Sequence, residues 1–309
     1  MKKGSRAVDA PDRRGRRRIN ATYHLMLLPG VALMLVFSYF PMYGIIMAFQ
    51  KYVPSLGIRG SQWVGWSNFS YLFRLPTISQ LFRNTLILAC SNVLLDILVP
   101  IAVAIMINEV THSWYRRTVQ TIVYLPHFLS WVMLGVVFKQ MFSNYGMFNN
   151  LLAALGMERL PIMSNNALFR TMLIVTNCWQ NFGWGTIIYL ASIVGIDPSL
   201  YESAVIDGAS RFQRIWHVTL PAMASVIVLK ATLSLGSVLN ANFDQVFNLY
   251  NVLVYESADI IDTYVYRMGL IQAQFSVATA VGLLKSCIST ALILASYFMA
   301  RRFANYRIF

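Results

Sequence analysis

Long apolar blocks alternate with shorter polar segments along the chain. An α-helix rises about 1.5 Å per residue, so roughly 20 residues cross a hydrocarbon layer about 30 Å thick. The pattern therefore predicts an all-α integral membrane protein with six transmembrane helices, the first of them bent by its prolines, Pro29 and Pro41. The six apolar blocks cover residues 25–50, 82–108, 118–142, 168–194, 222–239 and 275–300.

The distribution of positive charge predicts the orientation of these spans. Residues 1–20 are rich in Arg and lack an apolar face, so we expect a flexible basic cytoplasmic segment ahead of a six-span domain over 21–309. Lys and Arg are more frequent in the segments predicted inside than in those predicted outside, which places both termini and the loop at 195–221 in the cytoplasm. The block at 25–50 is longer than the apolar region of a signal peptide, which favours a retained helix.

Composition narrows the class of protein further. Hydrophobic residues make up 57% of the chain and charged residues 12%, whereas soluble domains carry about 25% charged residues. The formal net charge is +13, but the cations cluster beside apolar spans, so no nucleic-acid partner is expected. The 4 histidines lack metal-ligand spacing, and no phosphate-binding loop or catalytic constellation is present. We therefore expect a membrane protein that is not an enzyme and binds neither cofactor nor metal.

The polar loop between the fourth and fifth blocks has the features of two short helices. Residues 197–199 (Asp-Pro-Ser) are typical of a helix N-terminus, and Gly208 is expected to end that helix. Residues 211–215 suggest a second short helix, after which Leu220 and Pro221 are expected to turn the chain back into the membrane. A helix–Gly–helix element that carries charged and apolar residues, and is attached to a span at each end, is suited to binding another protein.

Two segments combine amide and aromatic side chains, one at 177–184 in the fourth block and one at 240–245, where the fifth block ends. Amides can hydrogen-bond the hydroxyls of a sugar, and flat aromatic faces can stack on its C–H groups. The same residues would also suit hydrogen bonds between helices and interfacial positions, so both interpretations stay open. The substrate-path candidates are Asn177, Gln180, Asn181, Trp184, Asn240, Asn242, Asp244 and, in the second block, Asp96.

Asp96 is an acid within an apolar block. A charge at the bilayer centre costs roughly 2.5–3.5 kcal/mol on insertion scales, so Asp96 should face protein or water. One interpretation is a pathway or proton-coupling group. The other is a structural partner of Lys230 or Lys285, or a neutral acid bonded to a neighbouring helix.

The loop between the fourth and fifth blocks resembles the conserved loop of binding-protein-dependent ABC importer permeases, Glu-Ala-Ala-x3-Gly-x9-Ile-x-Leu-Pro. All spacings of that pattern are kept, while Ser203 replaces one Ala and Val218 replaces Ile. The resemblance implies that the loop forms coupling helices seated in a groove of an ATPase subunit. It assigns coupling to Glu202, Ser203, Ala204, Asp207, Gly208, Arg211, Phe212, Leu220 and Pro221.

Segments 37–52, 84–110, 259–270 and 275–286 resemble permeases of the polysaccharide and complex-sugar branch of that family (LplB-like, maltose-permease-like). The resemblance implies the type I importer fold in the inner membrane of a bacterium. It also implies a second permease subunit, two ATPase subunits that use ATP and Mg, an extracytoplasmic solute-binding protein and an oligosaccharide substrate.

Two further points concern the substrate and the energy source. Outer cations would suit an acidic oligosaccharide such as a uronide, or would serve only as interfacial anchors; they are Lys51, Arg59, Arg74 and Arg159. The alternative function is an ion-coupled secondary transporter that uses Asp96 and Lys285, but it leaves the spacing of the polar loop unexplained.

Overall fold

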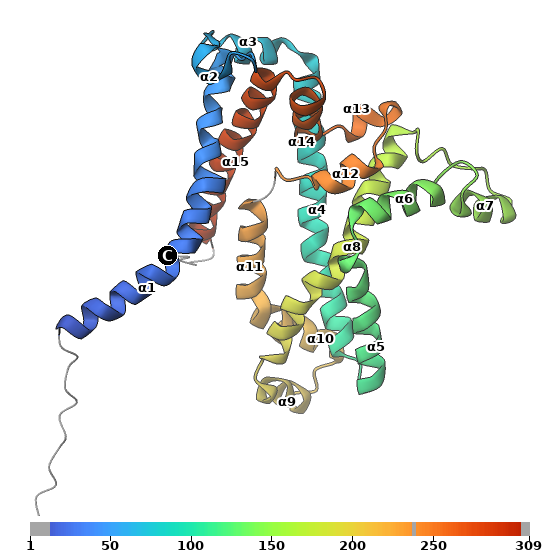
Figure 1. The fold of residues 1–309 in the computed structure, drawn as a ribbon. Helices are drawn as coiled ribbons and strands as arrows, with labels where there is room; N and C mark the ends of the chain where they lie inside the picture. The colour runs from blue at the N-terminus through green and yellow to red at the C-terminus, as the bar shows by residue number, and fades with distance from the viewer. Residues whose placement is uncertain (1–12, 237–238, 304–309) are drawn as a thin grey trace, which may run out of the picture.

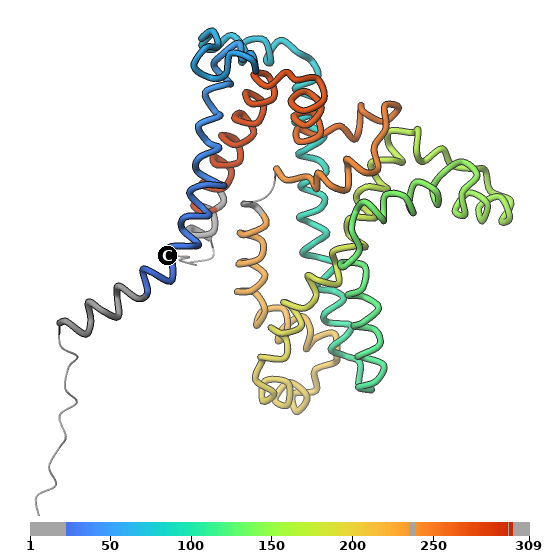
Figure 2. The backbone as a smooth tube through the Cα atoms, viewed as in Figure 1, coloured from blue at the N-terminus to red at the C-terminus, as the bar shows by residue number. Residues whose placement is uncertain are grey.

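The computed structural model describes residues 13–236 and 239–303, and helices dominate it (Figure 1). The first predicted span is formed by α1 (Arg13–Met34), the π-helix η1 (Leu35–Tyr39) and the 3-10 helix η2 (Phe40–Phe49). Pro29 lies inside α1, Pro41 lies in the first turn of η2, and the tube in Figure 2 changes direction along this span.

The basic N-terminal segment differs from the expectation. Residues 13–20 belong to α1, so this part of the segment predicted to be flexible is helical, and residues 1–12 lie outside the described part of the chain. Arg is a good helix former, and no proline precedes Pro29 within α1 to interrupt the helix.

One end of the molecule is built by the segment after the first span. The strands β1 (Gln50–Lys51) and β2 (Gln62–Trp63) pair antiparallel around α2 (Gly57–Gly60), and α3 (Ser67–Arg74) follows. The Asn68 side-chain amide donates to the carbonyls of Ala48 and Gln50, which fixes α3 to the top of the first span. In Figure 1 this end lies opposite α9 and α10.

The centre of the molecule is the helix pair α4 (Pro76–Asn108) and α8 (Asn166–Val194). Close approach of backbones positions α8, because a Cβ on Gly183 would overlap the carbonyl of Val123, and one on Gly185 would lie 2.9 Å from the Pro100 ring. The Thr186 hydroxyl is buried and bonds within α8 to the Phe182 carbonyl. Small residues thus let three membrane segments pack closely.

The third predicted span is not one straight helix. It consists of α5 (Ser113–Tyr124), η3 (Leu125–Phe128) and α6 (Trp131–Met141), with a bend of 98° between the two halves. Pro126 lies in the 3-10 turn before the break, and the Ser130 side chain caps the restarted helix. Figure 1 shows α6 and then α7 (Met147–Ala154) projecting away from the helix pair.

The second half of the chain begins at the predicted coupling loop. Its helices are α9 (Pro198–Ile206), α10 (Arg211–Arg214), the π-helix η4 (Ile215–Thr219), α11 (Leu220–Gly236), α12 (Phe243–Leu249), η5 (Val252–Val254), α13 (Tyr255–Ala258), α14 (Ile261–Tyr266), the π-helix η6 (Arg267–Ile271) and α15 (Phe275–Phe303).

Four helices among the described residues are long and apolar enough to cross a membrane, and a fifth span results if the bent pair counts as one. α8 occupies the fourth predicted span and has 29 residues, but its amides and glycines lower its hydropathy. The four helices are Tyr23–Phe49, Pro76–Asn108, Arg211–Ser234 and Phe275–Ala295.

Candidate functional site

The first candidate site is the element α9–α10 at one end of the molecule. Asp197 caps α9 by accepting a hydrogen bond of 2.9 Å from the Ser199 backbone, as the sequence predicts for a helix start. Hydrogen bonds from Ser199 hold the pKa of Asp197 below its ordinary value. Gly208 ends α9 with a left-handed φ of +77°, where a Cβ would meet nothing within 4 Å. The predicted helix–Gly–helix geometry is confirmed.

The predicted turn at Leu220 and Pro221 is wrong. α10, η4 and α11 form one helix over Arg211–Ser234, which carries the polar loop directly into the fifth span. Pro221 has no N–H for the helix ladder, and the preceding π-helical segment, in which Leu220 donates to the Ile215 carbonyl, accommodates it.

The α9–α10 element presents an apolar, aromatic surface. Ile206 is 85% exposed and Phe212 is 72% exposed, and the ring of Phe212 stacks on Trp216 with centroids 6.2 Å apart. The Tyr201 hydroxyl lies 3.0 Å from that of Thr219, so α9 is tied to η4. The predicted coupling residues did not include Ile206 or Trp216, or the two residues of the Tyr201–Thr219 contact. The alternation of exposed apolar and charged positions over 205–216 was their only signal in the sequence.

Most of the predicted coupling residues lie on this exposed element. Ser210 and Gln213 form a capping box at the start of α10, which sets the direction of the helix after Gly208. The predicted residues with exposed side chains or backbone are Glu202, Ser203, Asp207, Gly208, Arg211, Phe212 and Pro221; Ala204 and Leu220 are half-buried.

The second candidate site is a polar cavity of about 460 Å³ between α4, α8, α11 and α15. Its lining contains most of the predicted substrate-path residues. Asn177 is their centre, because its side-chain oxygen accepts hydrogen bonds from Asn242 at 2.7 Å and Asn181 at 3.1 Å. Asn242 adopts a left-handed φ of 56°, which points its backbone from the end of the fifth span into α12. The predicted residues in this lining are Asp96, Asn177, Asn181, Asn240 and Asn242.

An adjoining cavity of about 440 Å³ holds Gln180 and Asp244, and Asn181 and Asn242 line both spaces. This second lining includes His127, whose Nδ1 is buried without a partner among the described residues. Trp184 lines neither cavity but stacks on the His127 ring, with centroids 4.8 Å apart and planes 8° apart.

Some amides of the two clusters serve the helix packing. The Gln180 side chain donates to the Leu129 carbonyl at 2.8 Å, which satisfies the backbone at the break of the third span. Gln245 is buried and donates to the Leu173 carbonyl and the Thr176 hydroxyl. The helix-packing interpretation is therefore confirmed for Gln180 and Gln245, and the sugar-binding interpretation of the other amides stays a prediction.

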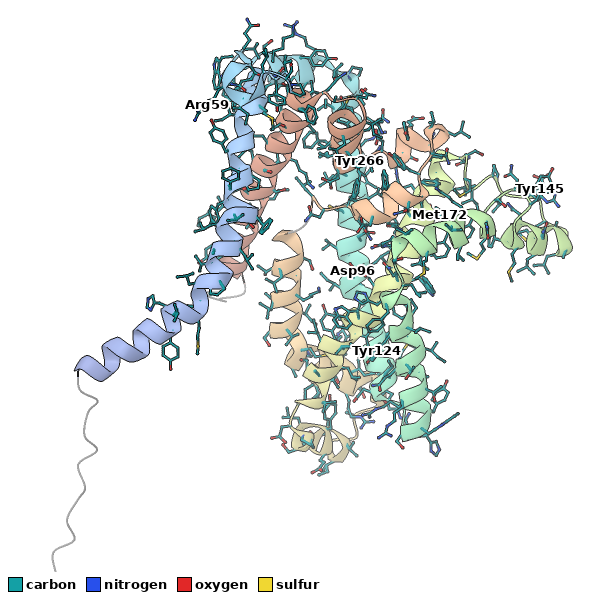
Figure 3. All side chains as sticks on the ribbon, viewed as in Figure 1. Arg59, Asp96, Tyr124, Tyr145, Met172 and Tyr266 are labelled. Atoms are coloured by element: carbon teal, nitrogen blue, oxygen red, sulfur yellow. The ribbon has the colours of Figure 1, made fainter. Side chains whose placement is uncertain are left out.

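Four charged residues line the polar cavity of about 460 Å³, and two of them form a salt bridge. Lys285 forms a salt bridge with Asp262, at 2.6 and 2.8 Å, and also donates to Asn240 at 3.1 Å. Of the alternatives left open for Asp96, a partnership with Lys285 is therefore excluded, because α14 brings Asp262 to the cavity from a segment expected in the outer loop. Asp96 instead shares the lining with Lys230, which attracts it electrostatically. Figure 3 shows Asp96 about midway along α4.

The segment around α13 is fixed to the central helices. Asn84 donates to the carbonyls of Glu256 and Asp259, and Arg170 donates to Asn84 and to the Ser257 carbonyl. Arg267 pairs with Asp259 and lies over the Tyr255 ring. These contacts place α14, and with it Asp262, beside the cavity. The sequence shows the two acids, Asp259 and Asp262, but does not show which residues they pair with in space.

The outer cations that would suit an acidic sugar are not gathered. Lys51, Arg59 and Arg74 belong to the end formed by β1, α2 and α3, whereas Arg159 lies over the Tyr145 ring beside α7. Figure 3 shows Arg59 and Tyr145 at opposite sides of the molecule. In the part of the chain that the structure describes, no group of three or more His, Cys, Asp or Glu could hold a metal ion.

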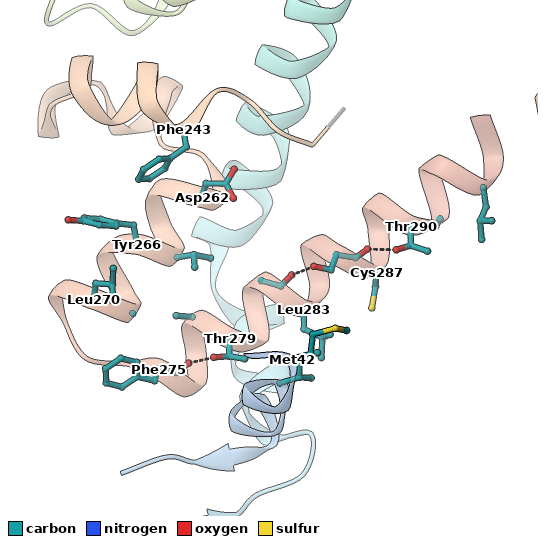
Figure 4. Close-up of a pocket in the computed structure, with 18 residues that line it drawn as sticks. Met42, Phe243, Asp262, Tyr266, Leu270, Phe275, Thr279, Leu283, Cys287 and Thr290 are labelled. Carbon is teal, nitrogen blue, oxygen red and sulfur yellow. Dashed lines mark hydrogen bonds between the residues drawn. The ribbon is translucent and has the colours of Figure 1, made fainter. Parts of the chain in front are cut away.

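A third cavity, of about 1270 Å³, is apolar and lies between η2, α14, η6 and α15 (Figure 4). Its labelled residues include Met42, Tyr266, Phe275 and Leu283. Asp262 lines this space as well as the polar cavity, so it stands at the boundary between an apolar surface and a polar interior.

Comparisons with known proteins identify the class. Residues 96–305 match the family described as binding-protein-dependent transport system inner membrane component, and the chain belongs to that family. It is a transport permease with the type I ABC importer permease fold. The match contains the loop at 195–221, most of the polar cavity's lining and four of the six predicted spans in full.

Several proteins resemble the chain over most of its length. The polygalacturonan/rhamnogalacturonan transport system permease protein YteP of Bacillus subtilis (strain 168) is 43% identical, with 93% of this chain and 89% of that protein covered. Protein LplB of the same strain is 40% identical over 93% and 90%. A crystal structure of a bacterial ABC transporter involved in the import of the acidic polysaccharide alginate contains a chain with TM-score 0.86 and 37% identity, covering 93% of this chain and 97% of that one.

Proposed function

We propose that this chain is the permease subunit of an ATP-driven importer of oligosaccharides derived from acidic polysaccharides. The observation that carries the proposal is the α9–α10 element, an exposed aromatic and charged surface rigidly continuous with a membrane span. Relatives named for polygalacturonan/rhamnogalacturonan transport and for alginate import support the substrate class.

The proposed partners follow the composition of such importers. A second permease subunit, two ATPase subunits and an extracytoplasmic solute-binding protein would complete the transporter, and ATP and Mg would be bound by the ATPase subunits. A solved relative was crystallised with an alginate pentasaccharide-bound periplasmic protein, which supports the binding-protein partner. The proposed location is the bacterial inner membrane, with both termini and the α9–α10 element in the cytoplasm.

The proposed mechanism assigns one role to each site. ATP binding would close the ATPase dimer and move the α9–α10 element, and the continuous helix Arg211–Ser234 would carry that displacement into the membrane. Glu202 would anchor the element by polar contacts, Gly208 would keep its bend, and Phe212 would be its buried anchor. The path residues would be the cavity amides Asn177, Asn181, Asn240 and Asn242, with Gln180, Asp244, Trp184 and Asp96 beside them.

The test is reconstitution of the complete transporter in proteoliposomes with ATP enclosed. We expect uptake of a labelled galacturonate trisaccharide that requires both the binding protein and hydrolysable ATP. Uptake that runs on an ion gradient without nucleotide would contradict the proposal and favour the secondary-transporter alternative.

A further inference from the structure

The formal charges that line the polar cavity cancel, but only two of the four charged side chains form a salt bridge with each other. Four ionisable side chains line it: Asp96 from α4, Lys230 from α11, Asp262 from α14 and Lys285 from α15. Asp262 and Lys285 neutralise each other through two short contacts of 2.6 and 2.8 Å. Among the described residues, Lys230 and Asp96 form no salt bridge within 4 Å, with each other or with any other residue. One cation and one anion therefore face the same space without a fixed partner.

Polar atoms around this second pair also lack partners. The Asp96 Oδ1 and the Asn92 Oδ1 are buried and accept no hydrogen bond from any described residue. Asn92 is only 9% exposed and lies one helical turn before Asp96 on the same face of α4. Buried polar groups are normally satisfied, so this side of the cavity is built for a hydrogen-bonding occupant.

A ligand in the polar cavity must offer both hydrogen-bond donors and a negative charge. The amides of Asn177, Asn181 and Asn242 can form hydrogen bonds with hydroxyl groups. The side-chain oxygens of Asn92 and Asp96 that lack partners need hydrogen-bond donors, which sugar hydroxyls provide. The ammonium of Lys230 can donate up to three hydrogen bonds and is the single ionic group of the described lining that could accept an anion without breaking a salt bridge.

We propose that Lys230 binds a carboxylate of an acidic oligosaccharide and that Asp96 is the counterion which that carboxylate replaces. In the empty cavity, Asp96 offsets the charge of Lys230 across the cavity and limits the cost of a cation in the membrane. When an acidic sugar enters, its carboxylate takes over Lys230, and a hydroxyl of the sugar donates to Asp96. The proposal rests on the proposed function and names the residues that would make it selective for anionic sugars.

The position of Lys230 adds a consequence for coupling. It lies on the same continuous helix as α10, 16 residues after Arg214, which corresponds to about 24 Å of helix. A substrate that pulls on Lys230 therefore acts on the helix that begins in the α9–α10 element. Asp262 has no such connection, because it lies in the short helix α14.

The test measures selectivity in the complete reconstituted transporter. The readout is the ratio of kcat/KM for a galacturonate trisaccharide to kcat/KM for the neutral galactose trisaccharide. All variants share one solute-binding protein, so changes in the ratio arise in this chain. We expect Lys230→Gln to lower the ratio about tenfold, Lys230→Arg to restore most of it, and Asp96→Asn to raise it several-fold. In the Lys230→Gln background, Asp96→Asn should have much less effect.

A matched control removes the other ion pair in the same cavity without changing net charge. The double variant Asp262→Asn/Lys285→Gln should leave the ratio within about twofold of the wild-type value, even if it lowers both rates. Uptake of the neutral sugar by each variant confirms that it is folded.

Lys230→Gln is expected to lower the selectivity ratio and Asp96→Asn to raise it. A purely structural role of the two residues would not give effects of opposite sign. If Lys230→Gln leaves the ratio unchanged, or if both single variants shift it in the same direction, the assignment of Lys230 is wrong while the proposed function stands. If wild-type transporter takes up only the neutral sugar, this assignment and the acidic substrate class of the proposed function are both wrong, while ATP-driven import of oligosaccharides stands. If it takes up neither sugar with ATP, the proposed function itself fails.

Discussion

The bend at Gly208 gives the sharpest test of the coupling element. Gly208→Ala introduces no clash, because a Cβ at this position meets nothing within 4 Å. Its effect comes from the backbone, since φ is +77° and a non-glycine residue in the left-handed region costs about 1–2 kcal/mol. That cost lowers the equilibrium ratio of the bent form to other forms by roughly 5- to 30-fold. We expect affinity for the ATPase subunit to fall by up to this factor.

The assay is titration of the proposed ATPase subunit against the permease in nanodiscs, together with sugar-stimulated ATP hydrolysis. Gly156→Ala is the matched control, because Gly156 has a φ of +74° and equally empty surroundings but lies between α7 and α8. It should lose similar backbone stability and keep ATPase binding. Gly208→Asn should behave better than Gly208→Ala, because Asn tolerates the left-handed conformation.

Two results would refute this reasoning. Equal loss of ATPase binding in Gly208→Ala and Gly156→Ala would show that the effect is general destabilisation. Unchanged binding and unchanged sugar-stimulated hydrolysis in Gly208→Ala would remove the bend from the coupling mechanism.

Three further predictions concern packing and capping. Gly183→Ala should destabilise the protein by about 1–3 kcal/mol or more, because its Cβ overlaps a neighbouring backbone, whereas Gly282→Ala, with nothing within 4 Å, should not; thermal unfolding in detergent compares them. Gln180→Ala removes the donor to the carbonyl at the break of the third span and should cost about 1–3 kcal/mol, seen as a lower Tm. Hydrogen bonds lower the pKa of Asp197. The contribution of this cap to the stability of α9 is therefore complete above the ordinary carboxyl pKa of about 4 and is lost as pH falls through the lower pKa of the folded state. Protection of the α9 amides from hydrogen exchange, relative to the intrinsic rate at each pH, measures this loss.

Each of these predictions has a clear contrary result. Equal unfolding temperatures for the Gly183 and Gly282 variants would mean that α8 can move away from α5 at no cost. An unchanged Tm for Gln180→Ala would mean that water or another group satisfies the exposed carbonyl. Lower protection factors over α9 at neutral pH than at pH 3, after correction for the intrinsic exchange rate at each pH, would reverse the sign argued for Asp197.

Local signals in the sequence predicted local structure well. The Asp-Pro-Ser start of α9 and the glycine that ends it are confirmed, because caps and left-handed turns depend on residues close in sequence. The apolar blocks located the long helices for the same reason. The turn expected at Pro221 is absent because a π-helical segment accommodates the proline, a geometry that the residue types alone do not specify.

Contacts between distant segments were the part that could not be predicted. The break in the third span depends on Gln180, which lies 51 residues after the carbonyl that it satisfies. The partner of Lys285 is Asp262, which reaches the cavity only because Asn84 and Arg170 fix the preceding segment to α4 and α8. No periodicity in a single chain encodes such pairings, although the residue types were available.

The π-helical segment η4 has a consequence for the orientation of the helix that follows it. A π-turn inserts one residue relative to an α-helix, and one residue corresponds to about 100° of rotation around the axis. If residues 215–219 became α-helical with all five residues kept, α11 would still be long enough to cross the membrane, but each later side chain would turn by about that angle. Lys230 would then point away from the acids and amides that it now faces. The rotation of α11 about its own axis is therefore fixed by the five residues of η4, which precede the apolar part of the fifth span.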